Sequence, residues 1–239
     1  MSGYELNDLH PLAPYVVELI GVKDGALTST VEDRAFTLDA GTSFGNGALG
    51  GHFRSLKNSY SGRAALIDPP VKMRIGDRPS SVMLITNYFD RSGLGSPNLA
   101  LGGTTGQAYV MGLNSTGVIT TPAWGAEVHS SVDATEPMTL CVAWTGSPEK
   151  VATIILNGEQ LATRDGDFTY GVDAYYNAIG ARPGHGSVTA DFVWVVFFQK
   201  TLSPAEVQGL ISTLGPNNAF GLVKGVQRGR SNPLFLTPF

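Results

Sequence analysis

Residues 190–215 read ADFVWVVFFQKTLSPAEVQGLISTLG, and this stretch decides the fold class. Apolar side chains occupy both alternations from Phe192 to Phe198. Because successive residues of a strand point to opposite faces of a sheet, this pattern predicts a central strand that is covered on both sides.

A short amphipathic helix is predicted directly after this strand. Ser203 suits the N-cap, Pro204 the first helical position and Glu206 the third, where it closes a capping box with Ser203. Gly215 and Pro216 end the helix, because neither continues a helix readily. The apolar positions that support the helix are Val207, Leu210, Ile211 and Leu214, with Leu202 and Val207 placed as a hydrophobic staple.

More strands are predicted before this stretch. Residues 138–144 alternate as a strand, and the lone cysteine, Cys141, is expected in the core. Residues 151–156 and 160–163 flank an Asn157-Gly158 step, which favours a tight antiparallel hairpin because both residues tolerate positive φ. The residues of 138–144 that share one face are Met138, Leu140, Val142 and Trp144.

The composition of the 239-residue chain agrees with an all-β class. It contains 30 glycines and 14 prolines among 42% hydrophobic residues, without the strict glycine period of collagen and with too many turn formers for a helical bundle. No internal repeat of fixed period is visible, which disfavours a propeller or a solenoid. We therefore predict an N-terminal arm over residues 1–28, which is either extended or one lead-in strand, and one β-sandwich over residues 29–214. Residues 215–239 form a C-terminal arm that either packs on the parent domain or inserts into a neighbouring subunit.

Charge and cysteine usage exclude several partners. Sixteen basic residues against 20 acidic ones give a net charge of −4, so neither a nucleic acid nor a membrane partner is expected. One cysteine allows no internal disulfide and no thiolate metal cluster. We expect no secretory signal at the N-terminus, although an export route that reads no N-terminal signal would leave the same pattern. No segment is long and apolar enough to span a membrane.

The order of these motifs resembles the laminin-G-like and concanavalin A-like jelly-roll domains. The matching segments are Val142-Ala143-Trp144, Ile155-Leu156-Asn157-Gly158, Ile179-Gly180, residues 190–195 and residues 201–210. The resemblance implies an antiparallel two-sheet sandwich with one short C-terminal helix and extended terminal arms. It does not imply an activity, because this sandwich carries lectins, hydrolases, adhesion modules and virion parts alike.

A second resemblance concerns the biological setting. Residues 230–238 are similar to the endings of laminin-G-like proteins that tailed phages and prophages encode. This similarity implies a virion structural protein, a capsid decoration or tail-associated subunit, that is made in the host cytoplasm and contacts other virion proteins. Its arms would join copies of the chain into a homo-oligomer, with assembly anchors at Pro233, Phe235, Leu236 and Phe239.

The alternative function is carbohydrate binding to a surface glycan. Trp124 and the pair Tyr175-Tyr176 stand in loop-like sequence, where aromatic rings can stack on a sugar. The competing interpretation of Trp124 is a plug at one end of the sandwich.

No catalytic residues are predicted. The acidic pairs Glu32-Asp33 and Asp165-Gly166-Asp167 do not place two carboxylates on one strand face, and the four histidines are scattered. Gly45, Gly47 and Gly50 fit a dinucleotide-loop pattern but lack the helix that must follow, so a turn is expected there. No cofactor is required, although calcium is considered through the oxygen donors Asp90, Asp165, Asp167 and Asp173.

Overall fold

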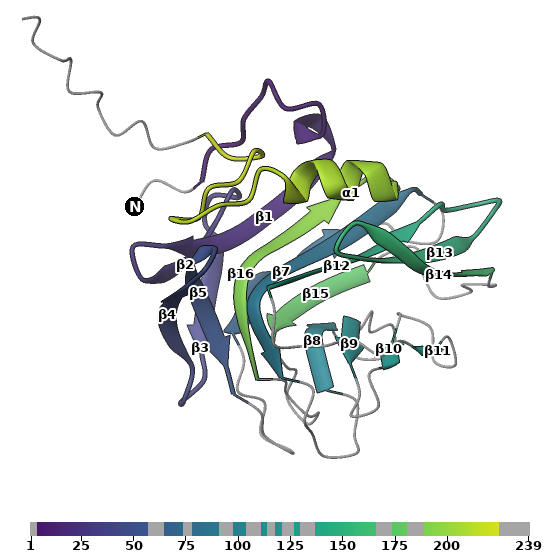
Figure 1. Ribbon diagram of the computed structural model, residues 1–239. Coiled ribbons are helices and arrows are strands. Elements are labelled where there is room, and N and C mark those ends of the chain that lie inside the picture. Colours follow the sequence, from purple (N-terminus) through teal and green to yellow (C-terminus); the bar gives the residue numbers. More distant parts are fainter. Residues whose placement is uncertain are drawn as a thin grey trace, which may run out of the picture.

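The computed structural model describes residues 4–56, 65–73, 78–90, 98–103, 111–113, 118–120, 127–129, 137–165, 174–180 and 189–224. Over these residues the chain forms two antiparallel sheets that face each other, with one helix on the outside (Figure 1). The predicted all-β jelly-roll sandwich with a single short helix is therefore confirmed.

The larger sheet has nine strands in the described residues. Seven follow the order β14-β13-β12-β7-β16-β1-β2, and β5 adds to β16 and carries β4. Its strands are β1 (Val16–Lys23), β2 (Ala26–Ser29), β4 (Ser43–Gly47), β5 (Gly50–Ser55), β7 (Ser80–Asp90), β12 (Met138–Trp144), β13 (Val151–Leu156), β14 (Glu159–Asp165) and β16 (Thr189–Phe198).

The second sheet has seven described strands in the order β11-β10-β9-β8-β15-β6-β3. They are β3 (Ala35–Leu38), β6 (Ala65–Met73), β8 (Asn98–Gly103), β9 (Met111–Leu113), β10 (Val118–Thr120), β11 (Glu127–His129) and β15 (Ala174–Ile179). The helical elements are the 3-10 turn η1 (Ala13–Tyr15) and the helix α1 (Pro204–Ile211).

Strand β16 is central, as its sequence predicts. It pairs with β7 along its length, while its other side pairs with β1 from Trp194 onward and with β5 over residues 190–192. Phe192, Val195 and Phe197 belong to the cluster between the two sheets, and Trp194 and Phe198 belong to a second cluster on the opposite face. Both faces of β16 are thus buried.

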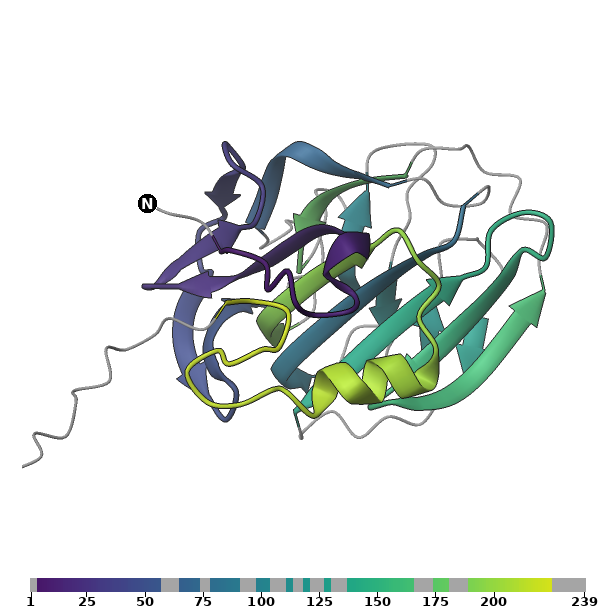
Figure 2. The same cartoon turned by 90° about the horizontal axis from the view of Figure 1, so that it is seen from above.

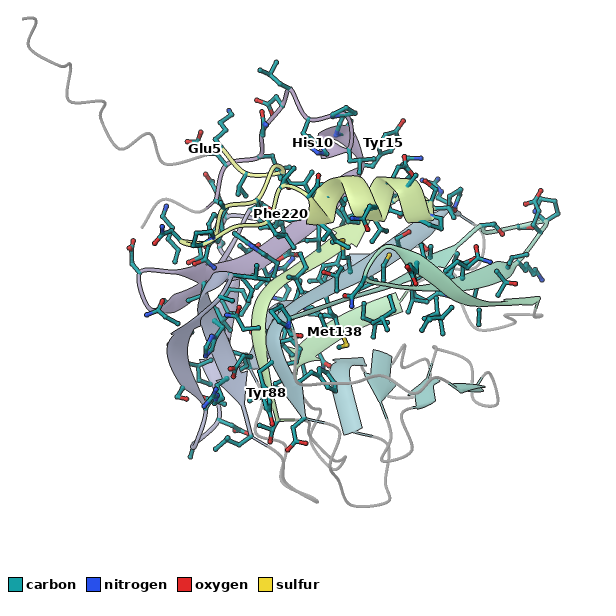
Figure 3. The ribbon with its side chains drawn as sticks, viewed as in Figure 1. Glu5, His10, Tyr15, Tyr88, Met138 and Phe220 are labelled. Atoms are coloured by element: carbon teal, nitrogen blue, oxygen red, sulfur yellow. The ribbon has the colours of Figure 1, made fainter. Side chains whose placement is uncertain are left out.

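The helix and the hairpin also form where the sequence predicts them. Ser203 caps α1, and the capping box with Glu206 is complete. Asn157 and Gly158 both have positive φ at the turn between β13 and β14. Cys141 is fully buried, and this burial raises the pKa of its thiol. The four residues predicted to share one face of β12 all pack between the sheets, and Figure 3 shows Met138 there.

The outer face of the nine-stranded sheet is covered by three segments. These are the N-terminal segment up to η1, the helix α1, and residues 213–224, which we call the C-terminal strap (Figure 2). Phe220 and Leu222 of the strap are buried on this face, and Phe220 packs 5.5 Å from Trp194 between ring centroids. Burial of these apolar side chains fixes the strap to the sheet.

Each terminal segment follows one of the two alternatives that the sequence leaves open, a lead-in strand at the N-terminus and packing on the parent sandwich at the C-terminus. Residues 16–23 of the predicted N-terminal arm are strand β1, which lies inside the nine-stranded sheet between β16 and β2. Residues 215–224 of the predicted C-terminal arm complete the outer apolar cluster. Both segments belong to the sandwich because the sheet offers them an apolar face, which their irregular spacing of apolar residues does not reveal. Residues 225–239 lie outside the described residues.

The contact of Trp194 with Gly21 predicts a large mutational effect. A Cβ on Gly21 would lie 2.2 Å from the Trp194 ring, which is buried and cannot move away. We expect Gly21→Ala to lower the free energy of unfolding by about 1–3 kcal/mol, as overpacking does in other cores. Urea denaturation measures this change in the free energy of unfolding.

Gly209→Ala is the matched control, because nothing lies within 4 Å of a Cβ at that exposed helical position. This substitution should stabilise α1 by up to about 1 kcal/mol. Equal effects of the two substitutions would contradict this packing.

Candidate functional site

A polar cluster occupies the outer face of the nine-stranded sheet, at the end that the C-terminal strap leaves open. Four strands place its members in cross-strand register. Ser43 of β4 pairs with Arg54 of β5, Arg54 with Asp191 of β16, and Asp191 with Tyr88 of β7. Paired residues of an antiparallel sheet share a face, so these side chains form one row. We call the row, together with His52 and Asn87, the end patch.

A β-bulge brings two consecutive residues of β7 to this face. Asp191 pairs with Tyr88 and Phe192 with Thr86, so Asn87 has no partner on β16. Such an extra residue bends a strand and redirects a side chain, and bulges are common beside functional sites. Asn87 contacts His52 at 3.0 Å on the outer face, while Tyr88 stays in the row with Asp191.

Arg54 and Asp191 form the charged centre of the end patch. The Arg54 guanidinium donates from Nε to Asp191 Oδ1 and from Nη2 to Asp191 Oδ2, both at 2.6 Å. The Asp191 side chain is 3% exposed, whereas that of Arg54 is 43% exposed. The hydrogen bond to Asp191 raises the pKa of Arg54, and the charge of Asp191 and then of Tyr88 raise it further against the opposing effect of burial. The two-point contact fixes the guanidinium plane and leaves its outer edge at the surface.

His52 supports the carboxylate from the buried side. Its Nε2 lies 3.3 Å from Asp191 Oδ2, and its Nδ1 lies 3.0 Å from Asn87 Nδ2. The orientation of the Asn87 amide is fixed, because Leu49 N donates to Oδ1 and Nδ2 donates to Gly50 O. Asn87 therefore presents a donor to His52, so His52 Nδ1 accepts, and the N–H of the neutral ring is on Nε2, which faces Asp191 Oδ2. This network needs a neutral imidazole.

The C-terminal strap anchors the same region through Asn218. Its Oδ1 accepts from Gly51 N and its Nδ2 donates to Gly51 O, at 2.7 and 2.8 Å. Asn218 N also donates to Leu49 O. A continuous set of hydrogen bonds thus runs from the strap through the β4–β5 turn and Asn87 to His52, whose Nε2 lies 3.3 Å from Asp191 Oδ2. The end patch is held rigid by backbone of three separate segments.

The neutral state of His52 predicts a dependence of stability on pH. Burial lowers the pKa of His52 below 6.5, Arg54 lowers it further, and Asp191 opposes this shift. The unfolded chain takes up the proton near pH 6.5, but the folded protein does so only at lower pH. The titration of His52 therefore does not change the free energy of unfolding above pH 6.5. It lowers that free energy as the pH drops from 6.5 toward the pKa of His52 in the folded protein. Thermal unfolding between pH 8 and 5 measures this loss.

The control for this effect is His52→Gln, whose amide can still donate to Asp191 but does not titrate. Burial also lowers the pKa of His10, and that contribution is present in both proteins. The variant should lose less stability than the native protein between pH 7 and 5. Parallel pH profiles would show that His52 does not contribute.

Two of the three predicted aromatic residues lie in a described strand. Tyr175 and Tyr176 belong to strand β15 rather than to a loop. Position 175 pairs with Lys72 and position 176 with Val71 of β6. Trp124 lies outside the described residues, as do the assembly anchors Pro233, Phe235, Leu236 and Phe239.

The predicted calcium donors are also separated. Asp90 is the last residue of β7. Asp165 lies near the opposite end of that strand, because it pairs with Val151, whose neighbour Ala152 pairs with Trp144. Trp144 in turn pairs with Ser80, the first residue of β7. Ten residues of extended strand span on the order of 30 Å, so Asp90 and Asp165 cannot share one ion. Within the described residues no three His, Cys, Asp or Glu side chains lie close enough together to hold a metal. Asp167 and Asp173 fall outside that part of the chain.

The glycine pattern of residues 45–50 is a hairpin, as expected for a turn. β4 and β5 pair antiparallel through this turn, and Gly45 lies against the His52 ring, where a Cβ would come within 2.6 Å of Nε2.

Among the described residues, no helix is long and apolar enough to cross a membrane.

No protein-family model and no curated protein sequence matches this chain. Solved structures do match its fold. The binding domain of botulinum neurotoxin DC in complex with SialylT aligns with a TM-score of 0.65 at 12% identity, covering 84% of this chain and 52% of that one. The binding domain of Paraclostridial Mosquitocidal Protein 1 aligns with a TM-score of 0.62 at 13% identity over 83% and 52%.

A third match comes from Geobacillus stearothermophilus. Domain 4 of the extracellular arabinanase AbnA, in complex with arabinotriose, aligns with a TM-score of 0.50 at 11% identity over 74% of this chain and 86% of that one. At these identities the matches show the fold alone, which is an antiparallel two-sheet sandwich of the concanavalin A-like type. The chain spans about half the length of the toxin structures that it matches.

Two of these three structures are complexes, one with SialylT and one with arabinotriose. The phage setting, the assembly role and the virion location stay predictions, and so does carbohydrate binding.

Proposed function

We propose that this protein is a non-catalytic carbohydrate-binding domain and that it holds a saccharide on the end patch. The observation that carries the proposal is the row Arg54–Asp191–Tyr88, in which an exposed guanidinium edge lies beside an aromatic ring on a rigid sheet. The fold shared with solved binding domains supports it.

The chemistry of this row suits a sugar. A sugar ring has hydroxyl groups that donate and accept hydrogen bonds and an apolar face that packs on aromatic rings. Arg54 uses Nε and Nη2 on Asp191, and Nη1 makes no hydrogen bond to the described residues. Nη1 and the Tyr88 hydroxyl can therefore bind sugar hydroxyl groups, while the Tyr88 ring offers an apolar contact.

The rigidity of the site also suits binding. Arg54, Asp191 and Tyr88 stand on strands rather than on loops, and Asp191 with His52 fixes the guanidinium before any ligand arrives. A site that is already ordered loses less conformational entropy when it binds. This reduces the cost of holding a flexible, strongly hydrated ligand.

A glycan array followed by calorimetric titration tests the proposal. The full chain should bind at least one class of saccharide, and Tyr88→Ala should weaken that binding at least tenfold. Tyr15→Ala is the matched control, because Tyr15 is 44% exposed and has the Lys200 ammonium over its ring, but lies away from Tyr88 (Figure 3). The proposal fails if no saccharide binds, or if the two tyrosine variants lose binding equally.

A further inference from the structure

We propose that His52 is a proton-sensitive latch for the C-terminal strap. While its imidazole is neutral, it keeps in place the β4–β5 turn on which the strap docks, and protonation of the imidazole releases this part of the strap from the sheet. The part concerned is residues 216–219, which we call the strap corner. The latch is a property of the fold and does not depend on the proposed saccharide binding.

The strap corner is held by the turn between β4 and β5. Asn218 N donates to Leu49 O, and the Asn218 amide exchanges two hydrogen bonds with the backbone of Gly51. Asn217 and Asn218 have φ values of 61° and 57°, a left-handed conformation that asparagine adopts at some cost. A Cβ on Gly50 would come within 2.4 Å of Asn218 N, so the two backbones are in close contact. The strap corner keeps its strained backbone because the turn holds it, and loosening of the turn favours its release.

Asn87 ties this turn to His52. Its Oδ1 accepts from Leu49 N, and its Nδ2 donates to Gly50 O and to His52 Nδ1. A proton on His52 Nδ1 would place an N–H group against the Asn87 NH2 group, so that two donors face each other. If the Asn87 amide turned over, its oxygen would accept from the ring, but its nitrogen would face Leu49 N–H and its oxygen would face Gly50 O. Protonation therefore costs either the contact with His52 or both hydrogen bonds to the turn.

The charged groups around His52 do not remove this conflict. Among the described residues that face the ring, Asp191 of β16 and Arg54 of β5 carry charge, whereas Gly45 of β4 and Asn87 of β7 do not. Asp191 lies 3.3 Å from Nε2, whereas the added proton goes to Nδ1 on the other side of the ring. Burial lowers the pKa of His52, Asp191 opposes this decrease, and Arg54 adds to it.

The direction of the pH effect follows from these states. When the turn and the strap corner open, water reaches His52, and the ring takes up a proton near pH 6.5. The closed form takes up the proton only at lower pH. Acid therefore has no effect on opening above pH 6.5, and each pH unit below 6.5 favours opening about tenfold until the pKa of the closed form is reached. Between pH 7.5 and 5 the equilibrium constant for opening should rise by up to about 30-fold.

Native-state hydrogen exchange, followed by NMR on the full chain at pH 7.5 and 5, tests the latch after correction for the intrinsic exchange rates. The reporters are Gly51 N–H and Asn218 N–H, which join the turn and the strap corner. We expect their opening constants to rise by between about fivefold and 30-fold. Low urea should change them little, because a local opening exposes little surface. The reference is Asn157 N–H at the β13–β14 turn, on the far side of the sheet from β4 and β5 (Figure 1), and it should change less than about twofold.

Three variants locate the proton. His52→Gln can still accept from Asn87 and donate to Asp191 but does not titrate, so its strap corner should show no acid-induced opening. Asn87→Asp presents an oxygen to the protonated ring and should also lose the effect, which gives a second readout if the glutamine variant does not fold. His10→Gln should keep the effect, because His10 also has a pKa lowered by burial but contacts Leu12 N instead of this network.

Three results would each overturn the inference. The first is equal opening of the native strap corner at the two pH values. The second is exchange of Gly51 and Asn218 with the urea dependence of global unfolding, since the strap corner then does not open separately. The third is an unchanged acid effect in His52→Gln.

Discussion

Replacement of Arg34 by alanine is expected to lower the free energy of unfolding by about 3–5 kcal/mol. Arg34 and Glu18 form an ion pair whose side chains are 8% and 1% exposed. The guanidinium donates from Nε and Nη2 to the two Glu18 oxygens, and Ser29 donates to Oε1. Without Arg34, the Glu18 carboxylate stays buried and keeps only the hydrogen bond from the Ser29 hydroxyl among the described residues. An uncompensated buried charge is strongly destabilising.

The same arginine also joins the two sheets. Arg34 Nη1 donates to the backbone oxygen of Pro69 in β6, while Glu18 stands in β1 of the other sheet. Urea denaturation followed by tryptophan fluorescence measures the loss. The control is Lys224→Ala, because Lys224 pairs with Glu5 and Asp8 at the surface and should leave the denaturation midpoint unchanged. Comparable losses in the two variants would show that burial of the pair does not matter.

Replacement of Arg54 by alanine is expected to have the largest effect on saccharide binding. Hydrogen bonds to a charged group contribute about 1.5–3 kcal/mol, so affinity should fall by between about tenfold and a hundredfold. The variant also leaves Asp191 buried without its cation, so a loss of stability accompanies the loss of binding. Calorimetric titration below the melting temperature of the variant separates the two effects.

Two further variants test the planar guanidinium of Arg54 and the hydroxyl group of Tyr88 separately. Arg54→Lys keeps the charge but loses the two-point contact with Asp191, and should bind with intermediate affinity. Tyr88→Phe removes only the hydroxyl group and should cost less than Arg54→Ala. If Arg54→Lys binds as the native protein does, the fork is not the binding group.

The fold was accessible from the sequence because its signals are local. The doubly apolar pattern of residues 192–198, the Asn157-Gly158 step and the Ser203 capping box each depend on residues within one element. Neighbouring side chains and short-range hydrogen bonds decide such structures, so a short window contains the information.

The end patch was not accessible in this way because its contacts are tertiary. Arg54 and Asp191 are 137 residues apart, and His52 and Asn87 are 35 apart. Their meeting depends on strand register and on a bulge in β7, neither of which a single sequence specifies. The one local signal was Asp191, a charged residue in a strand whose neighbours are apolar on both faces, since buried carboxylates are rare unless they are paired.

The positions of the terminal segments also depend on tertiary contacts. Their isolated aromatic residues show no periodic pattern, so the sequence leaves two alternatives open for each end and does not decide between them. In the structure Tyr4 and Phe220 pack on Trp194 from either end of the chain, with ring centroids 4.8 and 5.5 Å away. The apolar surface that orders them comes from β16, far away in sequence, so the segments carry little structural information by themselves.

The measurement that tests the central claim most directly is a two-dimensional NMR titration of the isotopically labelled chain with the saccharide that the array selects. We expect chemical-shift changes centred on Arg54, Tyr88 and Asp191, with smaller changes at His52 and at the β4–β5 turn. Changes centred on the seven-stranded sheet, with the end patch unaffected, would contradict it.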